Sequence, residues 1–444
     1  MDLEKLEELL HAKSYAQLKR ELVQQNQIDL AEWMDSLSSK DTLLVFRMLP
    51  KDLAAEVFSE LGKEQRKELI NTMTQSELSE VLDELYFNEM IDVLEEVPAI
   101  VVSKVLANST PQERRLINQF LKYPEDSAGS EMTIEYVELH PQMTVKEALE
   151  QIKDTGLTRK TVYTCYVTDN RHKLIGFVSL RELIVAKEDQ LVDDIKTDNV
   201  VSVEAHQDKE EVAQTLLRYG FLALPVVDSE NRLVGIITVD DVMDIMEEEA
   251  TEDFQLMGAT TPTESAYLET TAWTMAKNCL GWLMILMFSS TLSAWVINTH
   301  SAVLDKMIIL NTFIPMIIDT GGNTGSQSST LIIRALATGD VVLKDAVAVV
   351  WKEFRIALLC GITLSVVNFF RLNYIGHTGA LISLSVSITI LAVVMLAKII
   401  GACLPLIAKK VGLDPALMAG PLITTIVDAM GLLVYFAVIG VVLP

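Results

Sequence analysis

The sequence predicts a multidomain protein with three parts: an all-α superhelical N-terminal domain, an α/β tandem repeat, and an α-helical transmembrane domain of five helices. The first observation is an uneven charge along the 444 residues. From Thr271 onward there are seven acidic and ten basic residues, which leaves 54 acidic and 26 basic residues before it. The second observation is that the pattern of apolar residues changes along the chain. It has helical spacing in residues 1–128, repeats once within residues 129–249, and forms long apolar segments in residues 273–444. We therefore expect a water-soluble acidic half followed by a membrane-embedded half.

The composition also limits the partners. The formal net charge of -25 disfavours nucleic acid and anionic lipid as partners of the acidic half and favours metal cations, although surplus carboxylates are also typical of a solvated surface. The four cysteines are scattered without a CxxC pair, so they predict neither a disulfide framework nor a zinc site. The N-terminus lacks the basic and apolar regions of a signal peptide, which predicts that the acidic half stays in the cytoplasm.

Residues 1–128 are predicted to form short helices. Their apolar residues recur at helical spacing, and a weak repeat of 24 residues relates successive segments. Thr74 with Glu77 and Thr110 with Glu113 fit capping boxes, the second with proline at the first helical position. Stacked helix pairs of this kind predict a superhelical domain.

Residues 129–249 contain one α/β unit twice, in 129–190 and 191–249. Equivalent residues lie 59 positions apart, and each copy is predicted to run helix, strand, turn, strand, helix. The matched pairs are Gly176 with Gly235, Ser179 with Thr238, and Glu182 with Asp241. This order resembles a tandem pair of CBS domains. The resemblance implies an adenine-nucleotide site, although a Ser/Thr-x-x-acid pattern also simply begins a helix. The candidate ATP contacts are Thr238, Asp241, Phe221 and Arg181.

An acidic run follows at the end of the second copy. Between Asp240 and Asp253 there are eight acidic residues and no basic one, so on a helix these like charges repel. This favours a role in cation binding or at an interface over a solvated helix face. Residues 250–272 are predicted to form a connecting helix.

Residues 273–444 contain the five apolar segments of the predicted membrane domain. A transmembrane helix needs about 20 mostly apolar residues, and the third segment is short unless flanking residues join it. Seven basic residues flank one side and two flank the other, which places the N-terminus in the cytoplasm and the C-terminus outside. The segments are Cys279–Ile297, Met307–Ala337, Ile356–Phe370, Gly379–Ala408 and Leu417–Leu443.

Polar residues inside these segments predict a cation path. The run Gly321–Gln327 predicts a break in the second helix, which a membrane tolerates only where the backbone is buried or lines a water-filled path. Asp428 is an intramembrane carboxylate, functional by default, the alternative being a carboxylate hydrogen-bonded or protonated within the bundle. For Asp319 two roles are equally compatible with the sequence: it joins the cation path, or it caps the resumed helix. Oxygen ligands of this kind suit Mg²⁺ better than zinc or copper. The other candidate pore-lining residues are Asn323, Gln327, Thr424 and Thr425.

Taken together, these segments resemble the MgtE family of magnesium channels over nearly the full chain. The most specific matches are Gly321–Gln327, the segment beginning Asp414-Pro415, and Asp428. The resemblance implies a homodimer with a pore at the subunit interface, Asp428 holding Mg²⁺, and cytoplasmic carboxylates that bind Mg²⁺ and close the pore. The implied sensor positions are Asp241, Asp244, Glu249, Glu252, Asp253, Asp414, Asp92, Asp208 and Glu210. The departures are Asn88 and Gly220, where acids are expected, and Asp319, where a small residue is usual.

The sequence leaves three functions to compare. One is a Mg²⁺-gated channel that imports Mg²⁺ across the bacterial cytoplasmic membrane. A second is a transporter for Co²⁺ or Mn²⁺, which the sequence separates poorly from the first. A third is a membrane-anchored nucleotide or metal sensor that conducts nothing, for which Asp428 and the 321–327 run have no use. We find no nucleophile–base pair, phosphate loop or catalytic metal motif, so we predict no enzymatic activity.

Overall fold

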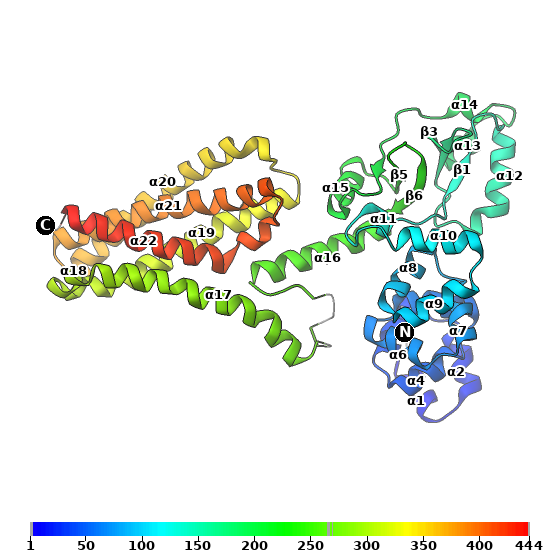
Figure 1. Ribbon diagram of the computed structural model, residues 1–444, viewed down its shortest axis with the longest axis horizontal. Coiled ribbons are helices and arrows are strands. Elements are labelled where there is room, and N and C mark those ends of the chain that lie inside the picture. The colour runs from blue at the N-terminus through cyan, green and yellow to red at the C-terminus, as the bar shows by residue number, and fades with distance from the viewer. Residues whose placement is uncertain (1–2, 264–266, 269, 443–444) are drawn as a thin grey trace. The chain divides into compact units, whose positions relative to one another are not determined.

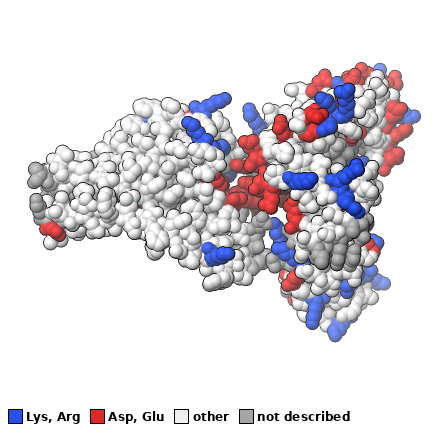
Figure 2. Space-filling model, viewed as in Figure 1, with Lys and Arg blue, Asp and Glu red and all other residues white. Residues whose placement is uncertain are grey.

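The computed structural model describes residues 3–263, 267, 268 and 270–442, and the chain divides into two compact units (Figure 1). The N-terminal unit, Met1–Met246, contains the helical domain and both α/β copies. The C-terminal unit, Glu247–Pro444, contains the long apolar helices. Figure 2 shows Asp and Glu gathered on the N-terminal unit and few charged side chains on the long helices, as the uneven charge predicts.

The N-terminal domain is a stack of short helices. Helix α3 packs on α5, α5 on α7, and α4 on α6, so neighbouring helix pairs bury one continuous apolar core. Both predicted capping boxes are confirmed, at the start of α7 and of α10. The helices are α1 Leu3–His11, α2 Tyr15–Leu22, α3 Gln27–Asp35, α4 Ser39–Phe46, α5 Lys51–Glu60, α6 Lys63–Thr72, α7 Gln75–Leu82, α8 Phe87–Glu96, α9 Ala99–Asn108 and α10 Pro111–Phe120.

The two α/β copies have the same topology, which confirms the predicted repeat. In each three-stranded sheet the first pairing is parallel and the second is antiparallel. The first copy comprises α11 Ala128–Glu131, β1 Val137–Leu139, α12 Val145–Thr155, η1 Gly156–Thr158, β2 Thr164–Thr168, β3 Leu174–Ser179 and α13 Leu180–Val185. The second comprises α14 Val192–Ile195, β4 Val203–Glu204, α15 Lys209–Tyr219, β5 Ala223–Val227, β6 Leu233–Thr238 and α16 Val239–Met257.

The copies are interlocked, because the segment that leads into the first copy pairs with the second. Thr133 forms a β-bridge with Ile236 of β6, and its N–H donates to the carbonyl of Ile236 at 2.8 Å. The sequence prediction missed strands β1 and β4, which have three and two residues and give almost no periodic signal.

The acidic run lies on one helix, as predicted, but that helix is shorter than expected. Helix α16 extends without interruption from Val239 to Met257. The predicted connecting helix over 250–272 is therefore helical only as far as Met257. Ala259 has a positive φ of 53°, and the N–H of Thr260 returns to the carbonyl of Gln255, which ends the helix. Residues 264–266 and 269 of this prediction lie outside the described residues.

The C-terminal unit is a bundle of long helices. Within its described residues, four helices are long and apolar enough to cross a membrane, namely α17, α20 with its flanking turns, α21, and α22 with the preceding η5. Helix α19 is a further long helix that carries the glycines and amides. The elements are α17 Ala272–Thr299, α18 Ser301–Lys306, η2 Ile308–Phe313, α19 Ile314–Ala337, η3 Leu343–Asp345, α20 Ala346–Phe370, η4 Arg371–Ile375, α21 Ala380–Val411, η5 Pro415–Met418 and α22 Gly420–Val442. The third apolar segment is long enough because the residues before Ile356 join it in α20.

The predicted helix break at Gly321–Gln327 is wrong. Helix α19 continues through this run, so its backbone groups are satisfied within the helix, and the irregular backbone is the preceding 3₁₀ turn η2. The glycines serve packing instead. A Cβ on Gly321 would lie 2.9 Å from Val393 on α21, and a Cβ on Gly401 of α21 would collide with the carbonyl oxygen of Gly325. Such small residues let membrane helices approach closely.

We expect Gly401→Ala to destabilise the bundle by about 1–3 kcal/mol, because the added methyl has no room against α19. The matched control is Gly281→Ala in α17, where no atom lies within 4 Å of the added Cβ. Thermal unfolding of the detergent-solubilised protein measures both variants. Equal melting temperatures for the two variants would contradict close packing at Gly401.

Candidate cation path and the carboxylates of the acidic helix

Asp428 lies on α22 beside the glycine run of α19. A Cβ placed on Gly322 would be 3.7 Å from Asp428 Oδ1, so the missing side chain leaves room next to this oxygen. Within the part of the chain that the structure describes, Asp428 Oδ1 is buried and accepts no hydrogen bond. A buried carboxylate oxygen without a donor is rare in proteins and indicates a site for a ligand.

The hydroxyls near Asp428 are oriented as acceptors. Thr424 and Thr425 both donate to the carbonyl of Pro421, at 2.8 and 2.9 Å. Since a hydroxyl has one proton, each oxygen then presents lone pairs to its surroundings. Thr424 also lies against Gly322, because a Cβ there would be 3.1 Å from the Thr424 methyl. The predicted association of Asp428 and Thr424 with the glycine run is therefore present in the structure.

The other candidate pore residues form a polar stripe on α19. Asp319, Asn323 and Gln327 are spaced four residues apart and all three are exposed. Asn323 Nδ2 donates to Asp319 Oδ1 at 3.0 Å. Because α19 is continuous, the alternative that Asp319 caps a resumed helix is wrong. An exposed polar stripe of this kind would be costly in hydrocarbon, so within a membrane it would require water or another protein surface in front of it.

The structure also shows a buried ion pair that the sequence prediction missed. Glu353 on α20 and Lys398 on α21 are 4% and 5% exposed, and Lys398 Nζ lies 3.7 Å from Glu353 Oε2. Ser328 on α19 donates to the same oxygen at 2.6 Å. These three side chains connect α19, α20 and α21 one turn beyond Gly325. Lys398 interrupts a 32-residue apolar helix, and this signal identifies it, since charged residues inside membrane segments mark functional or structural sites.

A second group of charges lies where α16 ends. Leu256 and Met257 pack against Ile333, Ala416 and Ala419, so the end of α16 contacts α19 and η5. Asp414 accepts from the N–H of Ala416 at 2.7 Å and caps η5.

Asp253 on α16 is half-buried at this contact. Burial, together with the carboxylates of Asp414 and Glu252, raises the pKa of Asp253 to about 6, and Arg334 opposes the rise. The local surplus of carboxylates therefore destabilises the ionised form of Asp253. A cation at this place would relieve that repulsion.

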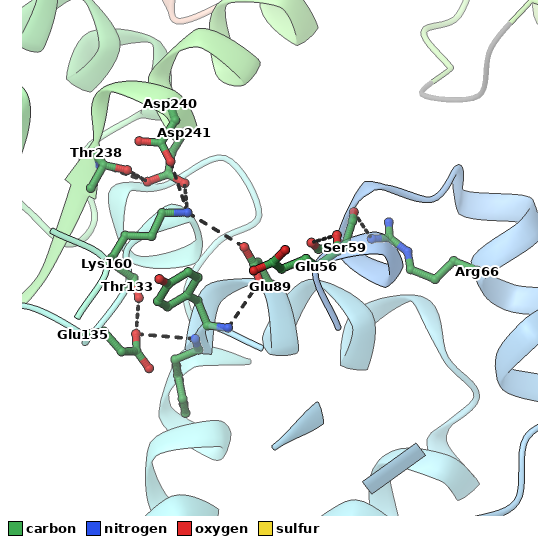
Figure 3. Close-up of polar contacts among 12 residues, drawn as sticks. Glu56, Ser59, Arg66, Glu89, Thr133, Glu135, Lys160, Thr238, Asp240 and Asp241 are labelled. Atoms are coloured by element: carbon green, nitrogen blue, oxygen red, sulfur yellow. Dashed lines mark hydrogen bonds and ion pairs between the residues drawn. The ribbon is translucent and has the colours of Figure 1, made fainter. Parts of the chain in front are cut away.

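At the other end of α16 the carboxylates already have a cation (Figure 3). Asp241 Oδ2 accepts from the N–H and the hydroxyl of Thr238, at 2.9 and 2.5 Å. Lys160 Nζ lies 3.6 Å from Asp241 Oδ1 and 3.2 Å from Asp240 Oδ2. The acidic run contains no basic residue of its own, as the sequence indicates, and the structure supplies one from elsewhere in the chain. The basic residue comes from the first α/β copy, about 80 positions earlier in the sequence.

The remaining sensor candidates lie in or at the start of three helices, α8, α15 and α16. Asp244, Glu249 and Glu252 follow one another along α16, and Asp92 lies exposed on α8. Asp208 caps α15 by accepting from the N–H of Glu210 at 2.9 Å. Among the residues that the structure describes, no three acidic, His or Cys side chains are arranged to hold a metal ion.

Two further nucleotide candidates are Arg181 and Phe221, of which Phe221 is partly buried. Arg181 is exposed on α13. Phe221 stacks on Tyr219 with ring centroids 5.4 Å apart. Thr238, in contrast, is 3% exposed and its hydroxyl donates to Asp241. The Thr238 and Asp241 side chains of the candidate nucleotide motif therefore bond to each other.

Comparison with known proteins identifies the family. A family model described as a divalent cation transporter matches residues 314–438, the MgtE intracellular N domain matches 25–126, and the CBS domain matches 128–189 and 192–248. The magnesium transporter MgtE of Thermus thermophilus is 39% identical over 437 residues, covering 98% of this chain and 96% of that protein. The chain belongs to the MgtE family. This confirms the resemblance stated from the sequence.

Further relatives of the MgtE family agree. The magnesium transporter MgtE of Bacillus subtilis is 34% identical and covers 75% of this chain and 73% of its own length. A solved cytosolic domain of the Mg²⁺ channel MgtE in complex with ATP is 36% identical, with a TM-score of 0.53, and covers 55% of this chain and 99% of that chain. The predicted soluble architecture, a helical domain followed by a CBS pair, is thereby confirmed. The relatives are named as transporters, which is a non-enzymatic class.

We expect Lys398→Met to destabilise the bundle by about 3–5 kcal/mol, because it leaves the Glu353 carboxylate buried without its cation. Glu353→Gln combined with Lys398→Met should recover most of this loss, since no buried charge remains. Thermal unfolding in detergent measures both, with Lys410→Met at the exposed end of α21 as the control. Additive losses in the double variant would show that the two residues do not act as a pair.

In Mg²⁺-free solution, we expect the end of α16 to pack more tightly as the pH falls from 7.5 to 5.5. The pKa of Asp253 is raised when α16 is packed, so the packed form takes up the proton and gains stability as the pH falls through about 6. Hydrogen exchange of residues 247–257, corrected for the intrinsic rate, measures this. Asp253→Asn should remove the pH effect and Glu247→Gln, an exposed acid on the same helix, should keep it. An effect that survives Asp253→Asn has another origin.

Proposed function

We propose that this MgtE chain is a Mg²⁺-gated channel that imports Mg²⁺ across the bacterial cytoplasmic membrane. The observation that carries the proposal is the buried Asp428 Oδ1 without a hydrogen-bond partner in the described structure, beside Gly322. A carboxylate with hydroxyl oxygens around it suits a hard cation that keeps part of its water shell. The names of the relatives, magnesium transporters and a Mg²⁺ channel, support Mg²⁺ as that cation.

The same oxygen donors suit the hard cations Mg²⁺ and Mn²⁺ better than Co²⁺. Between Mg²⁺ and Mn²⁺, the names of the relatives favour Mg²⁺. Asp428, Thr424, Thr425 and the α19 amides offer oxygen atoms, and no His or Cys is among them. Later transition metals bind better where imidazole or thiolate is present. A membrane-anchored sensor that conducts nothing is disfavoured, because it has no use for Asp428 at this position.

We infer that two copies of the chain line the pore. The stripe of Asp319, Asn323 and Gln327 is exposed on a membrane helix, and a water-filled path at a subunit interface gives it a polar environment. Asp428 and this stripe come from helices in direct contact, α22 and α19. A homodimer places two such surfaces around one path. Asp319 adds a carboxylate to each surface, which raises the local concentration of divalent cations.

The gate in this proposal is the contact between the end of α16 and the helices of the C-terminal unit. Leu256 and Met257 pack against Ile333 and Ala416, and Asp253 is half-buried there with Asp414 nearby. When cytoplasmic Mg²⁺ is high, it neutralises these carboxylates and the contact closes. When Mg²⁺ falls, the charges repel and the contact loosens.

The orientation follows from the basic residues at the helix ends. Arg334, Lys344, Lys352, Lys409 and Lys410 lie at or near one set of ends, with Arg371 at the other. The excess of basic residues on one side favours a cytoplasmic N-terminus and an external C-terminus. This orientation places the acidic α16 in the cytoplasm, where it can respond to internal Mg²⁺.

ATP is a second candidate ligand, of the CBS pair. Support comes from the solved cytosolic domain that holds ATP. Here the exposed Arg181 and the Phe221–Tyr219 stack offer a cation for phosphates and an aromatic surface for adenine. Thr238 and Asp241 contribute less in this chain, because they bond to each other and to Lys160.

We expect Asp428→Asn to reduce Mg²⁺ uptake into liposomes about tenfold or more, because the pore loses the charge that holds the ion. High Mg²⁺ on the cytoplasmic face should suppress uptake by the wild type. The control is Asp340→Asn, a carboxylate in the loop after α19 that accepts from Thr338. No flux in folded wild-type protein would refute the channel. Flux that ignores cytoplasmic Mg²⁺ would refute the gate.

A further inference from the structure

Lys160 is a partly buried cation among three carboxylates from two domains. Its Nζ lies 3.2 Å from Asp240, 3.6 Å from Asp241 and 3.8 Å from Glu89, and its side chain is 14% exposed (Figure 3). Glu89 belongs to α8 of the helical domain, whereas Asp240 and Asp241 begin α16. The ammonium also lies over the ring of Tyr86, 4.9 Å from its centroid. One lysine therefore connects the helical domain to the start of the acidic helix.

The backbone holds this lysine in place. The N–H of Lys160 donates to the carbonyl of Glu135 at 2.9 Å. The Glu135 carboxylate in turn accepts from the N–H of Phe87, the first residue of α8, at 3.5 Å. Its position is therefore set by the CBS segment on which it lies, and the ammonium is directed at α8.

Glu89 is shared between two tasks. Its Oε2 accepts from the N–H of Tyr86 at 3.2 Å and caps α8, while Oε1 is the oxygen that faces Lys160. Burial raises the pKa of Glu89, and Lys160 opposes that rise. For Lys160, burial disfavours the charge, but Asp241, Asp240 and Glu89 outweigh it and raise its pKa above the ordinary value. Each charge at this junction thus depends on the other for its ionised form.

The place that Lys160 occupies is one where carboxylates would otherwise require a metal ion. Without the ammonium, three carboxylates would face one another in a partly buried site, which costs stability.

We propose that Lys160 is a built-in cation that holds α8 against the start of α16, so that this junction stays closed without Mg²⁺. The inference rests on the proposed Mg²⁺ gating, and it reduces the set of residues in α16 that respond to Mg²⁺. Asp241 is occupied by the lysine, and the Mg²⁺ response of α16 lies in the residues beyond it, toward Asp253.

The test uses the full-length protein in detergent, with hydrogen exchange measured over α8 in EDTA and in millimolar Mg²⁺. In the wild type, exchange at α8 should be the same in both solutions. In Lys160→Met, exchange should rise roughly tenfold or more in EDTA, because the carboxylates repel, and return toward the wild-type rate in Mg²⁺. Lys160→Arg should behave as the wild type. The control is Lys51→Met, which breaks the surface pair with Glu80 and should leave α8 unchanged.

Three results would overturn the inference. One is a Mg²⁺-dependent exchange of α8 in the wild type. The second is unchanged protection of α8 in Lys160→Met without Mg²⁺. The third is a loss of protection that Mg²⁺ does not restore, which would make the lysine a packing residue only.

Glu89→Gln keeps the inference testable if Lys160→Met does not fold. This variant weakens the same contact while the lysine stays, so α8 should exchange faster in EDTA, and Mg²⁺ should not restore it. No change at α8, or full rescue by Mg²⁺, would contradict the role of Lys160. Since exchange is read without transport, a wild type that carries no Mg²⁺ refutes the channel and leaves this result unaffected.

Discussion

Each carboxylate that this chain takes out of water needs a positive charge, and the source of that charge differs from place to place. Glu353 inside the bundle has Lys398, and the start of α16 has Lys160. The half-buried Asp253 has only an opposing contribution from Arg334 against two neighbouring carboxylates. Asp428 is next to glycine and hydroxyls, with no basic partner in the described structure. The carboxylates paired with a lysine are neutralised within the chain, and those without one are the positions where our proposal places a mobile cation.

The continuous α19 explains how the chain combines close packing with a polar surface. Gly321 and Gly325 face α21 and α22, where a side chain would collide with Val393 or Ile423. Asn323, which lies between them in sequence, is exposed. A helix period of 3.6 residues separates these two faces without any break in the backbone. Helical hydrogen bonds thus satisfy the backbone, and only side chains remain for the ion.

The sequence predicted what depends on local patterns. The 59-residue repeat, the capping boxes at Thr74 and Thr110, and the single acidic helix are all set by residues close in sequence. The predicted helix break at 321–327 was wrong because a glycine-rich run has two explanations, a flexible backbone or close helix packing. Only the neighbouring helices distinguish the two. The pairs of Lys160 with Asp241 and of Lys398 with Glu353 are distant in sequence, so no periodicity reveals them. Lys398 alone had a local signal, as a charge within an apolar helix.

The two ends of α16 therefore differ in how their carboxylates are neutralised, although they belong to one continuous helix. At its start, the positive charge comes from Lys160, which is part of the chain and does not depend on the solution. In our proposal this charge holds that end of α16 against α8. At its other end, Asp253 lies in a surplus of carboxylates whose balance depends on what the solution supplies. A fixed charge confers no response, because a ligand shifts an equilibrium only through a difference in affinity between two states. In the proposed gate, carboxylates that a lysine neutralises no longer contribute to Mg²⁺ binding. Fewer Mg²⁺ ions then take part, and we expect a less steep response to Mg²⁺.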